Sequence, residues 1–120
     1  MSAWVFMDIT KKNDVNALLD FYGGLLTLKQ RRYLVAYFAD DLSIVEIAEN
    51  EQVSRQAVSD NIHRGVDLLK HYETILHLQR DYVARRGMEH QLEQWIDAHY
   101  NDDATLKQRL NMLINYEETD

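Results

Sequence analysis

Seven polar side chains between residues 54 and 64 could bind a partner through hydrogen bonds. They are Ser54, Arg55, Gln56, Ser59, Asp60, His63 and Arg64. Residues three or four positions apart share one side of a helix, so this spacing places most of the set on a single outer face. We take these residues as the candidate nucleic-acid-binding set.

The segment from residue 42 to residue 72 predicts the two helices that would position this set. Ser43, with Glu46 three residues later, forms a capping-box pattern at the start of a short first helix. Ser54 is a favourable N-cap for the second helix. Apolar residues recur every three or four positions on the second helix, at Ala57, Val58, Ile62, Val66 and Leu69. Small Ala48 allows close approach, so the pattern predicts a helix-turn-helix, although similar helix pairs occur in bundles that bind nothing.

The turn between these two helices contains no glycine. Its residues are Asn50, Glu51 and Gln52, whereas glycine is the usual residue where the backbone needs a positive φ angle. Either Asn50 or Gln52 must therefore supply the left-handed geometry. Gly65 lies inside the second helix, where we expect it to weaken the helix by about 1 kcal/mol relative to alanine.

Catalytic groupings are missing from the sequence. None of the five histidines has a second histidine four residues later, and no HExxH, phosphate-binding loop or GxGxxG pattern occurs. The serines are explained as helix caps and one contact residue, so a nucleophile, a base and an orienting group cannot be assembled. We therefore expect no enzyme activity, no cofactor and no metal site.

The composition favours a cytoplasmic protein. The chain has no cysteine, which fits a reducing compartment. No apolar run approaches the roughly 20 residues needed to span a bilayer. The first residues lack the basic start and the small-residue cleavage site of a signal peptide, and Met7 is a candidate alternative start.

The charge distribution argues against simple duplex-DNA binding. The net charge is −7, and residues 73–120 contribute −5 of it, whereas residues 27–42 carry +1. A DNA-binding domain normally concentrates positive charge, because neutralised phosphates supply most of its nonspecific affinity. The acidic balance would oppose any local basic stripe.

The rest of the sequence predicts an all-α fold. Helical patterns cover residues 13–22, then residue 27 to about 38, 81–86, 89–100 and 104–116. Candidate N-caps of these helices are Asn13 or Asp14, Thr27 and Asp103. We expect the adjacent Gly23 and Gly24 to stop the first of these helices in a left-handed turn, and Gly87 to end another. Aromatic residues in the first two helices, together with Leu28, should form core. We divide the chain into a helix-turn-helix domain, residues 8–80, and an acidic C-terminal helical extension, residues 81–120.

The extension carries a strong apolar stripe. Its members are Leu92, Trp95, Ile96, Leu106, Leu110 and Leu113. Such a face needs a cover, which could be the first domain, a second copy of the chain or a different protein. We favour packing on the domain or in a homodimer, and take the stripe as the candidate partner interface.

Four segments resemble the YlxM-like helix-turn-helix proteins of Gram-positive bacteria. They are LLDFYGGLLT (18–27), YFADDLSIVEIAE (37–49), VSRQAVSDNIHR (53–64) and HYETILHL (71–78), within a match over residues 8–80. The resemblance implies a helix-turn-helix like that of sigma-factor region 4. It also implies a link to the signal recognition particle, because the family's genes neighbour those of the particle GTPase and its receptor. The chain departs from the family at Glu51-Gln52, where relatives often have glycine second.

Two functional hypotheses follow, and a purely structural helical module is the third interpretation if neither kind of partner is found. The first is a regulatory or accessory protein of the signal recognition particle pathway that binds the particle's protein or its RNA. The second is a sequence-specific DNA-binding transcriptional regulator, which the polar outer face of residues 54–64 would support.

Overall fold

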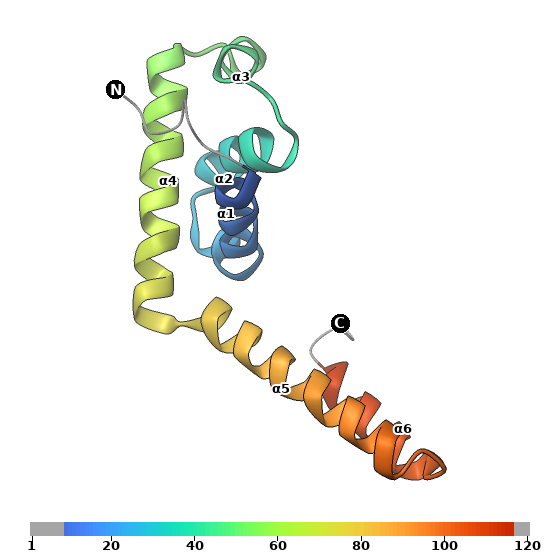
Figure 1. Cartoon of the computed structure of the whole chain (residues 1–120). Helices are drawn as coiled ribbons and strands as arrows, with labels where there is room; N and C mark the ends of the chain where they lie inside the picture. Colours follow the sequence, from blue (N-terminus) through green and yellow to red (C-terminus); the bar gives the residue numbers. More distant parts are fainter. Residues whose placement is uncertain (1–8, 117–120) are drawn as a thin grey trace. The chain divides into compact units, whose positions relative to one another are not determined.

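All the regular structure in residues 9–116, which the computed structural model describes, is helical (Figure 1). The elements are α1 (Ile9–Tyr22), the 3₁₀ turn η2 (Gly23–Leu25), α2 (Leu28–Leu34), the π-helical turn η3 (Val35–Ala39), α3 (Ile44–Glu51), α4 (Arg55–Leu76), α5 (Leu78–His99) and α6 (Ala104–Ile114). The prediction of an all-α chain is confirmed. The described residues form two compact units, divided after Gln79, and each is described separately below.

Helix α4 organises the first unit. Helices α1, α2 and α3 all pack against α4. The predicted aromatic residues contribute to this core, since Tyr22 and Tyr33 are buried and Phe21 and Tyr37 pack at its edge. Leu28 is a wrong prediction, because its side chain is 81% exposed. Its neighbours one helical turn later are arginines exposed to solvent, so Leu28 lies on the outer face of α2.

Gly65 is buried where α2 crosses α4. A Cβ atom on this residue would lie 2.3 Å from Cδ1 of Leu34, whose side chain is fully buried. The missing side chain therefore lets the two helices approach, a role that the sequence pattern did not reveal. Helix α4 is 22 residues long and is not interrupted at Gly65.

The predicted caps Thr27, Ser43, Ser54 and Asp103 are confirmed, whereas the predicted cap at Asn13 or Asp14 is wrong, because both residues lie inside α1. The Thr27 and Ser43 hydroxyls accept backbone N–H groups three residues later, each at 3.1 Å, and both capping boxes are complete. Ser54 accepts at 3.0 Å and Asp103 at 2.9 Å in the same way. These contacts satisfy amides that have no partner within the helix.

The predicted stop at Gly23-Gly24 is right in position, because α1 ends at Tyr22, but wrong in conformation, and the predicted stop at Gly87 is wrong. Neither Gly23 nor Gly24 has a positive φ angle, and α1 passes into a 3₁₀ turn instead of a left-handed one. Gly87 lies inside α5, so the two helices predicted over 81–86 and 89–100 are one. A glycine lowers helix stability without ending a helix that has good helix formers on both sides.

The second unit is a helical hairpin. Residues 100–103 form the turn after which α6 runs back along α5 (Figure 1). Ile96 is its buried apolar residue, and Lys107 pairs with Asp97 at 3.4 Å across the two helices. Among the described residues, no helix is both long enough and apolar enough to span a membrane.

Candidate functional site

The turn between α3 and α4 takes its shape from Gln52. This residue has φ 56° and ψ 45°, the left-handed conformation, and it ends α3. The Val53 amide donates to the carbonyl of Ala48 at 3.1 Å, which closes the turn. Of the two candidates, Asn50 and Gln52, it is Gln52 that adopts the left-handed conformation, although it lacks the conformational freedom of glycine.

Helix α3 braces the first turns of α4. Ile47 and Ala48 on α3 are 2% and 5% exposed, and Val58 on α4 is fully buried. Val53 packs against the same core from the turn. Because Ala48 adds only a methyl group between the helices, they can approach closely, and the start of α4 is held in a fixed position.

The N-terminal end of α4 presents two long polar side chains. Ser54 is exposed but caps the helix, so its hydroxyl is already bonded to the Ala57 amide. Arg55 and Gln56 follow it, and both are exposed. Gln56 Nε2 donates to Asp60 Oδ1 at 2.9 Å, one helical turn later. Both side chains therefore reach solvent at the N-terminal end of the helix.

The next turns of α4 are more enclosed. Ser59, Asp60 and His63 are half-buried, whereas Arg64 is exposed. His63 Nδ1 donates to the Ser59 carbonyl at 2.9 Å, which holds the ring against the helix. The predicted set therefore lies on one helix, but Arg55, Gln56 and Arg64 supply its exposed long side chains.

The charges around this end of α4 are mixed. Helix α3 carries Glu46, Glu49 and Glu51 and no basic residue. Arg32 on α2 forms an ion pair with Glu51, and its guanidinium also lies 5.7 Å from the ring of Tyr33. The positive charge of Arg32 is therefore neutralised within the unit, and this weakens any general attraction of α2 for phosphates.

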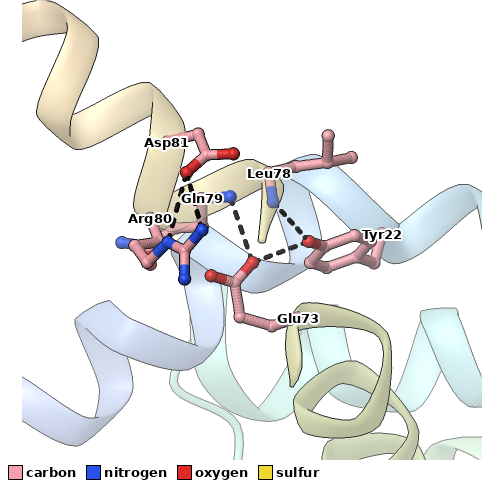
Figure 2. Close-up of polar contacts among 6 residues, drawn as sticks. All are labelled: Tyr22, Glu73, Leu78, Gln79, Arg80 and Asp81. Atoms are coloured by element: carbon pink, nitrogen blue, oxygen red, sulfur yellow. Dashed lines mark hydrogen bonds and ion pairs between the residues drawn. The ribbon is translucent and has the colours of Figure 1, made fainter. Parts of the chain in front are cut away.

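The junction between α4 and α5 contains a polar corner that the sequence did not predict (Figure 2). The buried Tyr22 hydroxyl donates to Glu73 Oε1 at 2.6 Å and accepts the Leu78 amide at 3.0 Å. Glu73 Oε1 also accepts the Gln79 amide at 3.0 Å. His77, with φ 56°, ends α4 one residue before α5 begins. The two amides that begin α5 are thus satisfied by side chains from elsewhere in the fold.

Burial raises the pKa of Tyr22 above its ordinary value of 10.0, and the hydrogen bond to Glu73 raises it further. Desolvation disfavours the phenolate, and so does a neighbouring carboxylate that needs a proton donor. The hydroxyl is therefore kept protonated, which is the state that can bridge Glu73 and Leu78.

The predicted apolar stripe is divided by the fold of the hairpin. Leu92, Trp95 and Leu113 are 45%, 50% and 71% exposed. Ile96 is only 4% exposed, and Leu106 and Leu110 are half-buried within the hairpin. Only Leu92, Trp95 and Leu113 of the stripe therefore remain exposed on the hairpin.

No three histidine, aspartate or glutamate residues form a metal-binding group within residues 9–116. The polar groups around α4 offer hydrogen bonds and two guanidinium charges.

A braced helix preceded by a tight turn, with its N-terminal end exposed, defines a helix-turn-helix protein. The family model described as "UPF0122: Putative helix-turn-helix protein, YlxM / p13 like" matches residues 9–113. The chain belongs to this family, which confirms the resemblance noted in the sequence. The family description names no catalytic activity.

Relatives match over nearly the whole chain. A UPF0122 protein of Pediococcus pentosaceus is 46% identical over 112 residues, which cover 93% of this chain and 99% of the relative. A UPF0122 protein of Streptococcus suis is 49% identical over 110 residues, covering 92% and 94%. One of Limosilactobacillus reuteri is 45% identical over 112 residues, covering 93% and 99%. The similarity therefore includes the α5–α6 hairpin.

Proposed function

We propose that this protein is a regulatory or accessory component of the signal recognition particle pathway. It would act through a helix-turn-helix like that of sigma-factor region 4, within residues 8–80. Family membership supports this proposal through the gene neighbourhood that the resemblance implies. The structural observation that carries it is the exposed N-terminal end of α4, where Arg55 and Gln56 extend beyond the Ser54 cap.

The partner in this proposal is the particle's protein or its RNA. With a net charge of −7 and an acidic α3, the chain has little general attraction for phosphates. Binding would therefore depend on specific contacts from α4. The acidic extension, residues 81–120, would offer a second contact surface. A cytoplasmic location follows from this role and stays a prediction.

The test is a titration of the full chain against the reconstituted particle, with and without its RNA. Arg55→Ala and Gln56→Ala should each weaken binding. Lys70→Ala is the matched control, because Lys70 is exposed on α4 and lies 15 residues from Arg55, about 22 Å along the helix. No association with or without RNA would overturn the proposal. Equal losses for Arg55→Ala and Lys70→Ala would reject the end of α4 as the contact.

Sequence-specific DNA binding is the alternative function, and one observation favours it. Arginine and glutamine are the side chains that make paired hydrogen bonds with guanine and adenine edges. Here Arg55 and Gln56 occupy the end of α4, the part of a helix-turn-helix that usually contacts bases.

This alternative predicts binding to the gene's own promoter that weakens steeply with salt. Arg55→Ala or Gln56→Ala should remove the preference for that sequence, whereas Lys70→Ala should change affinity for all sequences alike. Absent or salt-independent binding would argue against it.

A further inference from the structure

Six residues of α5 lie along one line of the helix. They are Asp81, Arg85, Met88, Leu92, Trp95 and His99, and we call them the α5 seam. The intervals between them alternate between four and three residues, which is the spacing of the contact positions in a coiled coil. All six are exposed, and the apolar members Met88, Leu92 and Trp95 are 63%, 45% and 50% exposed.

Helix α6 covers a different side of α5. Ile96, one position beyond the seam residue Trp95, is buried in the hairpin, and Asp97 pairs with Lys107 of α6. One position corresponds to about 100° around a helix. Two seam residues lie nearer to α6: Leu92 is four positions before Ile96, and Arg85 lines a hollow with Leu113 and Ile114. Both side chains nevertheless remain exposed, so the hairpin leaves most of the α5 seam accessible.

When the α5 seam is compared with the same seam in reverse order, each residue faces one of compatible chemistry. Positions 81, 85 and 88 mirror positions 99, 95 and 92 about residue 90. We propose that a second copy of this chain pairs with α5 in antiparallel orientation. Met88 then faces Leu92 of the second copy, Arg85 faces Trp95, and Asp81 faces His99.

Each of these layers joins compatible groups. Met88 and Leu92 bury apolar surface. The Arg85 guanidinium meets the face of an indole, the ring that binds cations best. Parallel pairing would instead place Arg85 against Arg85 and Asp81 against Asp81, and such like-charge contacts are destabilising. The seam therefore selects the antiparallel arrangement.

The charges along α5 support the same orientation. Residues 80–88 carry a net charge of +2, and residues 89–99 carry −3. Antiparallel pairing places each half against the half of opposite sign, which favours association and sets the register. The residues that flank one side of the seam, Ala84, Gln91 and Ala98, are uncharged, and the two alanines allow two helices to approach closely on that side.

This dimer goes beyond the proposed function, because it does not depend on what α4 binds. Sedimentation equilibrium of the full chain should show a reversible monomer–dimer equilibrium. Leu92→Glu should weaken the dimer at least tenfold, or by about 1.4 kcal/mol. Val83→Glu is the matched control: Val83 is 58% exposed on the same helix, nine residues away and therefore on the opposite side. Circular dichroism confirms that both variants keep their helix content.

Disulfide trapping tests the orientation, since the chain has no cysteine of its own. Asp81→Cys and His99→Cys variants are mixed and oxidised. Antiparallel pairing predicts a disulfide between the two different variants, because position 81 of one copy faces position 99 of the other. The two copies of position 81 would lie about 27 Å apart, too far for a disulfide. Disulfides between identical variants would overturn the orientation. A chain that stays monomeric at every concentration would overturn the dimer and assign the seam to a different partner.

Discussion

Replacing Gly65 with alanine gives opposite predictions from local and tertiary arguments. Helix propensity alone favours the substitution, because alanine stabilises a helix interior by about 1 kcal/mol relative to glycine. In the structure, however, the new Cβ atom would lie 2.3 Å from Leu34 Cδ1 and 3.2 Å from Leu34 Cγ. Ordinary contacts begin at 3.4 Å, so a displacement of about 1 Å is needed.

Leu34 cannot easily move by that distance. Its side chain is fully buried where α2 crosses α4. Overpacking a core in this way costs about 1–3 kcal/mol. After subtraction of the gain in helix propensity, we expect Gly65→Ala to lower the free energy of unfolding by about 1 kcal/mol. The melting temperature should fall by about 4–8 °C for a unit of this size.

Urea unfolding followed by circular dichroism measures the effect. Gly87→Ala is the control, since Gly87 is also inside a helix but has nothing within 4 Å of the added Cβ atom. It should gain stability or leave it unchanged. In a Leu34→Ala background, the loss caused by Gly65→Ala should disappear, because the two sites share one space. A Gly65→Ala protein as stable as the original, or more so, would refute the close-approach argument.

Three further substitutions test the polar corner, the turn and the cap. Tyr22→Phe removes the hydroxyl that accepts the Leu78 amide, and should lower the free energy of unfolding by about 1–2 kcal/mol; an unchanged urea midpoint would contradict the corner. Because the pKa of Tyr22 is raised in the folded state, its contribution is fully present below about pH 10 and is lost as the pH rises further, and this pH dependence should be smaller in Tyr22→Phe. Gln52→Gly relieves a residue at φ 56° and should raise stability by about 0.5 kcal/mol; a loss on urea unfolding would show that the Gln52 side chain has a stabilising role. Ser54→Ala removes the acceptor of the Ala57 amide and should lower stability by about 1 kcal/mol, so an unaffected thermal midpoint would argue against the cap.

Capping residues and helix periodicity were readable because they act within a few residues. Thr27, Ser43, Ser54 and Asp103 each bond to an amide only three positions later, so their role is contained in a short window of sequence. The helix-turn-helix and its exposed outer face followed from the same kind of local pattern.

Glycines and apolar stripes were harder to interpret. Gly23, Gly24 and Gly87 were expected to end helices, but only the first two follow a helix end, and they do so without a left-handed turn. Glycine is compatible with both a helix and a turn, and the rest of the fold decides which occurs. Ile96 and Trp95 are adjacent in the sequence, and both belong to the predicted apolar stripe. Only the position of α6 buries the first and exposes the second.

The amino-acid sequence alone determined that this chain is helical, where the helix-turn-helix lies and which side chains its second helix presents. Tertiary structure decided which faces meet. It placed Gly65 against Leu34, and it joined Tyr22 to Glu73 across 51 residues. Such contacts depend on the packing of separate helices, whose distances and crossing points no local sequence window contains.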